Sequence, residues 1–198
     1  ITREKAPGPS PTFSVFHILR AMELIHEKEI GRSKLAEKLS VGEGAVRTII
    51  AHLKDAGLVN TSKAGCILSG KGSRLWKEYK SIFKKKIGIE KSELTLANHS
   101  FAILIKNRGH KVKSGVEQRD AAVMAGAKAA TTIVFKDRRL IIPSVSNNVG
   151  EDFPTAANQI IRHLEPEEND VIVIGSADIQ GKAEYGTLAA AWTLLNDR

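Results

Sequence analysis

One segment decides the fold of the first half of the chain: Ser33-Lys-Leu-Ala-Glu-Lys-Leu-Ser-Val-Gly-Glu-Gly-Ala-Val-Arg-Thr-Ile-Ile-Ala-His-Leu-Lys-Asp-Ala-Gly-Leu-Val-Asn-Thr-Ser-Lys-Ala-Gly-Cys-Ile-Leu68. We expect Ser33 to cap a short helix over residues 34–39, because a serine hydroxyl accepts a hydrogen bond from a free N–H of the first turn. Residues 40–42 interrupt the apolar period, which resumes at Ala45. The segment therefore predicts a helix, a tight turn and a second helix.

The second helix is predicted to have one buried face and one exposed face. Four aliphatic residues recur with the spacing i, i+3, i+4 and i+7, which is typical of a buried stripe: Val46, Ile49, Ile50 and Leu53. The opposite face then carries small or polar residues: Gly44, Arg47, Thr48, Ala51 and Asp55. We expect the helix to end at Gly57, because glycine favours the position that follows a helix.

The pattern changes after the second helix. An extended segment begins at residues 58–59, residues 61–65 form a short polar turn, and residues 66–68 return. This alternation predicts a two-stranded wing, and Ile30 is expected to form a short strand beside it. Cys66, the only cysteine, excludes an internal disulfide and any zinc site built on cysteines, and we interpret it as a small buried hydrophobic residue.

Residues 39–58, followed by Leu68-Ser-Gly-Lys-Gly72, resemble prokaryotic winged-helix transcription regulators. In those families the second helix enters the major groove of DNA, and the wing lies along the backbone or the minor groove. The arrangement of the whole chain is also similar to an uncharacterised archaeal family, in which a winged helix precedes a domain of unknown function. The resemblance implies double-stranded DNA as a partner, but it implies no biochemistry for the second half.

This docking arrangement predicts which residues contact DNA. Arg47 would offer its guanidinium to a guanine, and Lys63, at the tip of the wing, would reach only the backbone or the minor groove. The complete set of candidates comes from the two helices, the wing and the start of the next helix: Ser33, Lys34, Glu43, Gly44, Arg47, Thr48, Ala51, His52, Thr61, Ser62, Lys63 and Lys71.

The excess of positive charge is confined to the first half of the chain. Residues 1–90 contain 17 Lys and Arg against 9 Asp and Glu, whereas residues 91–198 contain 13 of each kind. Basic charge attracts phosphate independently of base sequence, so we expect residues 1–90 to carry the affinity for DNA.

At 198 residues, the chain is long enough for two small domains. We predict a flexible arm over residues 1–11, a winged-helix domain over 12–88 and an effector or dimerisation domain over 89–198. The arm is rich in proline, and Thr12 or Ser14 is expected to cap the first helix. No apolar run approaches the length of a membrane span and no signal-peptide pattern is present, so we expect a cytoplasmic protein that does not bind membranes.

A long helix is predicted after the wing, with Lys84–Lys86 at its solvated end. Its apolar stripe includes Trp76, Tyr79 and Phe83. This stripe is our candidate for the interface of a homodimer, because one winged helix contacts only a short half-site. The stripe has two other interpretations, since it would also serve to close the winged-helix core of a monomer, and the C-terminal domain is an alternative interface.

The second half is predicted to be a small α+β sandwich with the order β-α-β-β-α-β-α, so that the whole chain belongs to the α+β class. The expected strands cover residues 94–105, 131–135, 140–142 and 171–174, and the expected helices cover 117–125, 151–164 and 183–195. The two central strands flank residues 136–139 and are expected to form a hairpin.

The second half contains no phosphate-binding glycine loop, no nucleophile elbow and no metal-binding pair of His and Glu at helical spacing. We therefore expect no catalytic residues, metal or cofactor. Residues between the last strand and the last helix form a candidate site for a small ligand, because a helix N-terminus attracts anions: Ser176, Asp178, Gln180, Gly181 and Lys182. The alternative that we favour is that Ser176 or Asp178 simply caps the helix.

These patterns support one leading hypothesis and two alternatives. The leading hypothesis is a transcription regulator whose winged helix binds DNA, while the C-terminal domain senses a small-molecule effector, dimerises or does both. The first alternative is a winged helix that binds another protein. The second is an enzyme in the C-terminal half, which clustering of five residues around one pocket would favour: His99, His110, His163, Glu117 and Asp178.

Overall fold

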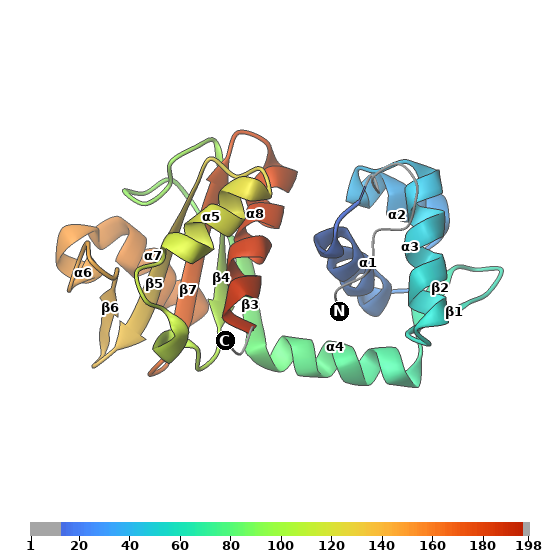
Figure 1. Cartoon of the computed structure of the whole chain (residues 1–198), viewed down its shortest axis with the longest axis horizontal. Helices are drawn as coiled ribbons and strands as arrows, with labels where there is room; N and C mark the ends of the chain where they lie inside the picture. The colour runs from blue at the N-terminus through green and yellow to red at the C-terminus, as the bar shows by residue number, and fades with distance from the viewer. Residues whose placement is uncertain (1–12, 196–198) are drawn as a thin grey trace. The chain divides into compact units, whose positions relative to one another are not determined.

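The computed structural model of the chain describes residues 13–195 (Figure 1). The chain divides into two compact units, Ile1–Glu78 and Tyr79–Arg198. This division lies before the expected one at residue 88, because residues 83–88 form a strand of the second unit. The expected arm over residues 1–11 and the alternative cap at Thr12 lie outside the described residues.

Unit 1 contains the predicted winged helix. Its elements follow in the order α1 (Val15–Glu27), α2 (Arg32–Leu39), α3 (Glu43–Asp55), β1 (Val59–Thr61) and β2 (Cys66–Leu68), and α4 (Gly70–Ile82) comes after the wing. The expected cap at Ser33 is wrong: the N-cap of α2 is Gly31, and Ser33 lies inside the helix. The expected turn is present, since Ser40 ends α2 in a left-handed conformation and Gly42 is the N-cap of α3.

Helix α4 does not present the free apolar stripe that we expected. Trp76 is only 4% exposed, and its ring centroid lies 5.9 Å from that of His26 on α1. Phe83 is 3% exposed, and its ring stacks on that of Trp192 with 6.3 Å between the ring centroids. Both residues belong to unit 2. Because the rings of Trp76 and Phe83 are covered within the monomer, they do not form the exposed stripe that we expected at a dimer interface.

The expectation of a solvated helix end at Lys84–Lys86 is also wrong, because Phe83–Gly88 forms strand β3. This strand pairs in antiparallel fashion with β4 (His99–Ile105). Lys86 donates to Glu184 Oε1 at 2.6 Å, and both side chains are largely buried. Pairing with distant residues therefore overrides the local helical pattern here.

Unit 2 is built on a five-stranded antiparallel sheet in the order β3-β4-β7-β5-β6. The remaining elements are α5 (Val116–Met124), β5 (Ala129–Lys136), β6 (Arg139–Ile141), α6 (Val149–Asp152), α7 (Pro154–Leu164), β7 (Val171–Ala177) and α8 (Gln180–Trp192), with short 3-10 turns at Gly109–Lys111 and Thr193–Leu195. The predicted order is present, with β3 added in front. The expected helix over 151–164 is broken at Phe153, since Pro154 starts a new helix.

Two layers of helices cover the sheet. Helices α5 and α8 contact each other, and α8 packs on β4 and β7 (Figure 1). Helix α7 supplies Ala156, Ile160 and Leu164 to a core with Leu104 and Ile172 on the other face. All seven residues of β7 are buried, which is expected of a central strand that is covered on both faces.

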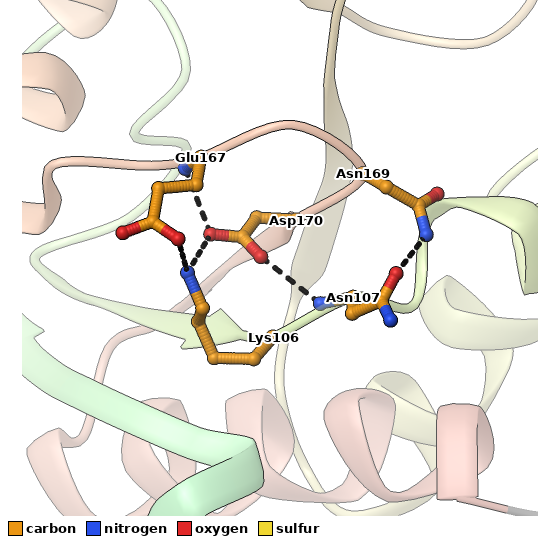
Figure 2. Close-up of polar contacts among 5 residues, drawn as sticks. All are labelled: Lys106, Asn107, Glu167, Asn169 and Asp170. Carbon is orange, nitrogen blue, oxygen red and sulfur yellow. Dashed lines mark hydrogen bonds and ion pairs between the residues drawn. The ribbon is translucent and has the colours of Figure 1, made fainter.

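A buried carboxylate ties two loops of unit 2 together (Figure 2). Asp170 is 1% exposed and accepts hydrogen bonds from Lys106 Nζ at 2.8 Å, from the Asn107 N–H at 2.9 Å and from the Glu167 N–H at 2.8 Å. Burial opposes the charge on Lys106, but its hydrogen bonds to Asp170 and Glu167 outweigh burial and raise its pKa. The loop after β4 is thereby fixed to the loop before β7.

We predict that Asp170→Asn destabilises the chain by about 2–4 kcal/mol, because an amide cannot accept from all three donors and leaves buried polar groups unsatisfied. Glu167→Gln is the control, since the Glu167 side chain is 79% exposed and its ion pair should contribute less than about 1 kcal/mol. Urea unfolding curves of the full chain measure both effects. Equal losses in the two variants would contradict a dominant role for Asp170.

Candidate nucleic-acid interface

Helix α3 has the predicted buried and exposed faces. Val46 and Ile49 are completely buried, and Ile50 and Leu53 are nearly so. Gly44, Arg47, Thr48, Ala51 and Asp55 are exposed, as expected. Burial of the aliphatic stripe therefore determines which side chains α3 presents to solvent.

A groove of about 570 Å³ separates α3 from the wing and from the start of α2. Six of the predicted residues line it together: Ser33, Arg47, Ala51, Thr61, Ser62 and Lys63. Four of the lining residues are cationic, namely Arg32, Arg47, Lys54 and Lys63, and no carboxylate is among the described residues that line the groove. The groove therefore has the positive potential that attracts a polyanion.

Arg32 and Lys54 are groove residues that the sequence analysis missed. Lys54 lies seven residues after Arg47, so the helical period already places both side chains on one face. Arg32 is the first residue of α2, and its place in the groove depends on how α2 packs beside the wing. The signal for Lys54 was present in the sequence, whereas the position of Arg32 required the tertiary structure.

The wing is held by an isolated β-bridge and by the hydrogen bonds of one serine. Strands β1 and β2 pair from Val59↔Leu68 to Thr61↔Cys66. Ile30, which we expected to form a short strand beside the wing, makes an isolated antiparallel bridge to Cys66. Ser62 donates to Glu29 Oε1 at 2.7 Å and accepts from the Ala64 N–H at 3.0 Å. These bonds order the turn that carries Lys63.

Cys66 is 3% exposed, and burial raises the pKa of its thiol. The side chain therefore contributes to the packing of the wing, in agreement with our interpretation of this residue.

The remaining DNA-binding candidates lie outside the groove. Lys34 pairs with Glu37 at 2.8 Å, His52 makes an edge contact with Phe13, and Lys71 donates to the Ala56 carbonyl at the end of α3. The other three are exposed residues of α3: Glu43, Gly44 and Thr48. The structure thus divides the predicted set into a groove group and a group on neighbouring surfaces.

The structure does not favour the ligand site predicted before α8. Ser176 is 2% exposed and already bonded to Ser100 Oγ at 2.8 Å, and Asp178 pairs with Lys128 at 2.5 Å. The expectation that Ser176 or Asp178 caps α8 is wrong as well, because the N-cap is Ile179. The first turn of α8 holds the other three candidates, Gln180, Gly181 and Lys182.

Within residues 13–195, no three His, Cys, Asp or Glu side chains lie close enough to hold a metal ion. No helix in the same range is long and apolar enough to cross a membrane.

Comparisons with known proteins match the N-terminal and the C-terminal half of the chain to two different families. Residues 14–83 match the model of the CggR N-terminal DNA binding domain. Residues 96–194 match the model described as a domain of unknown function (DUF4443). No curated protein matches the chain. A solved structure, described as "Hypothetical protein PH0730 from Pyrococcus horikoshii OT3", is 28% identical and aligns with a TM-score of 0.72 over 92% of both chains.

We predict that Arg47 and Lys63 act differently on duplex DNA. Arg47→Ala should remove about 1–3 kcal/mol of preference among sequences, because Arg47 projects from α3, where a guanidinium can bind guanine. Lys63→Ala should weaken binding to all sequences alike, since a residue at the wing tip meets phosphates. Competition between randomised duplexes, followed by sequencing of the bound fraction, measures both. If both variants lose affinity equally for every sequence, α3 does not contact the bases.

Proposed function

We propose that this chain, which belongs to the family described as a domain of unknown function (DUF4443), is a transcription regulator that binds duplex DNA through α3 and the wing. In this proposal unit 2 senses a small molecule, dimerises or does both, and we assign it no reaction. The match of residues 14–83 to a DNA-binding domain supports the first part of the proposal.

The observation that carries the proposal is the groove between α3 and the wing. Arg32, Arg47, Lys54 and Lys63 line it from three elements, and none of these four cations forms an ion pair that we observe in the described part of the chain. Cations gathered without carboxylates repel one another, and a phosphate backbone relieves this repulsion. The small residues Gly44 and Ala51 leave the exposed face of α3 narrow enough to enter the major groove.

The second candidate function is recognition of another protein by the winged helix. The same basic groove would then bind an acidic partner, and its affinity for DNA would be weak. The strength of the salt dependence separates the two functions, because counterions released from duplex DNA make binding fall steeply as salt increases.

We predict that the full chain binds duplex DNA with an affinity that falls with salt, and that Lys54→Gln reduces the slope of log K against log salt by about one unit. The slope changes because one phosphate contact is lost. Lys77→Gln is the matched control, since Lys77 is an exposed lysine of α4 outside the groove and its loss should leave the slope nearly unchanged. Fluorescence anisotropy at several salt concentrations measures all three proteins.

Binding that does not depend on salt, or equal changes of slope in the two lysine variants, would contradict the proposed interface. In the first case the protein-recognition alternative gains support.

We propose that unit 2 also forms the homodimer. Met124 is 89% exposed, Val123 is 48% exposed and Ile179 is 57% exposed. Val123 and Met124 lie at the end of α5, and Ile179 directly precedes α8, the helix that contacts α5. These exposed apolar side chains replace the stripe on α4 as our candidate interface, because exposed apolar area is what a dimer buries.

We predict that Met124→Glu converts a dimer into a monomer at micromolar concentration, because it places a charge on the most exposed of these three side chains, where the dimer would bury it. Ile161→Glu, on α7, is the control and should leave the dimer intact, since Ile161 is 47% exposed on the other helical layer. Sedimentation velocity measures the mass of each protein. A wild-type chain that is monomeric at these concentrations would exclude this interface.

A further inference from the structure

Unit 2 contains a cavity of about 350 Å³ between the start of α5, strand β5 and the loop after β6. This volume lies in the range of sites that hold small molecules. The cavity is separate from the residues before α8 that the sequence analysis had selected.

The cavity lies beside an open edge of the sheet. Strand β6 pairs only with Val134–Lys136 of β5, so that residues 129–133 have β7 on one side and no described strand on the other. Pro143 follows β6 after one residue, and proline has no N–H with which to continue the ladder. The chain therefore turns away and leaves residues 130–132 to line the cavity.

A buried hydroxyl group in the wall of the cavity has no hydrogen-bond partner. Thr132 is 4% exposed, and its Oγ1 makes no hydrogen bond in the described part of the chain. Thr132 lies against the N-cap of α5, since a Cβ added to Gly115 would lie 3.2 Å from Thr132 Cβ and 3.5 Å from Thr132 Oγ1. An unsatisfied buried hydroxyl costs free energy unless another molecule bonds to it.

The start of α5 supplies positive charge at the same place. Gly115 is the N-cap with φ of 78° and provides no side chain to bond the free N–H groups of the first turn. Arg119 lines the cavity one turn later, and it is the only charged residue among the described residues that do so. Its exposed guanidinium also donates to Asp120 Oδ1 from Nε at 3.1 Å and from Nη2 at 2.9 Å, so a ligand carboxylate would share Arg119 with Asp120. Glu117 belongs to the same turn but is not part of this lining. A helix N-terminus together with an arginine favours an anion.

Six of the other lining residues are large and apolar: Leu94, Val116, Ile142, Pro143, Val145 and Phe153. Ser114, Thr131 and Ser144 add hydroxyl groups to the wall. An inorganic anion would leave the apolar surface uncovered. We propose that the cavity binds a small carboxylic acid, with the carboxylate at Thr132, Arg119 and the start of α5, and with an apolar body against these six side chains. The role of this ligand as an effector rests on the proposed function, but its binding does not depend on DNA.

A second groove in unit 2, of about 520 Å³, is the competing site for an anion. It is lined by Arg138, Arg139 and Arg162, which are all exposed, and no buried group without a partner has been found among its described lining residues. Substitutions of Thr132 and Arg119 in the cavity, and of Arg162 in this groove, distinguish the two sites.

The test is isothermal titration calorimetry of the full chain with phenylacetate, phenylacetamide and inorganic phosphate as probes. We expect phenylacetate to bind at least about tenfold more tightly than the neutral amide or phosphate, because only the acid supplies both charge and an apolar body. Thr132→Val and Arg119→Gln should each lower the affinity for phenylacetate by about tenfold or more. Arg162→Gln, the matched control, should change the affinity less than about twofold.

Thermal unfolding without ligand verifies that Thr132→Val is folded, and its midpoint should equal or exceed that of the wild type because an unsatisfied hydroxyl group is removed. Three results would overturn the proposal: no binding of phenylacetate, unchanged binding by folded Thr132→Val, or loss of binding in Arg162→Gln alone. These titrations contain no DNA, so a chain that fails to bind DNA leaves their outcome interpretable.

Discussion

The burial of one face of α3 is the constraint on which the rest of the candidate interface depends. Val46 and Ile49 have no exposed surface, so the helix cannot rotate without placing aliphatic side chains in water. With that face held, Arg47 and Lys54 lie on the exposed side of the helix, where they line one groove with Lys63. The positive groove is therefore a consequence of core packing, and the cations that line it are available to phosphate because no described carboxylate lines it with them.

Strand β7 has the corresponding role in unit 2. It lies between β4 and β5, and every one of its seven residues is buried, so both layers of helices are positioned against it. The close approach of α8 to β7 requires a glycine at position 175, because a Cβ added to Gly175 would lie 2.4 Å from Thr187 Oγ1. The edges of the sheet are less constrained. On one edge β6 is short, and this leaves the part of β5 that carries Thr132 beside a cavity instead of a neighbouring strand.

Much of the fold was predictable from local patterns, and so was part of the candidate site. The winged helix, the hairpin at residues 136–139 and the buried strand before α8 all follow from apolar period and turn chemistry. Six of the twelve DNA-binding candidates share one groove. The helical period places Arg47 and Ala51 on the same face of α3, whereas Thr61 joins them through the packing of the wing. Lys54 follows from the same period, although we did not select it.

By itself, the sequence determined which faces of the helices are buried, where the turns lie and that positive charge belongs to the first half. Only the tertiary structure decided that residues 83–88 form a strand, that Trp76 and Phe83 are covered, and that Arg32 lines the groove with Lys63. Period and capping act over one or two helical turns and can be recognised in a short stretch of sequence. The pairing of β3 with β4, the ring of Trp192 over Phe83 and the hydroxyl of Thr132 beside Gly115 join residues far apart in the chain, and the free energy of such contacts depends on the packing of the whole unit.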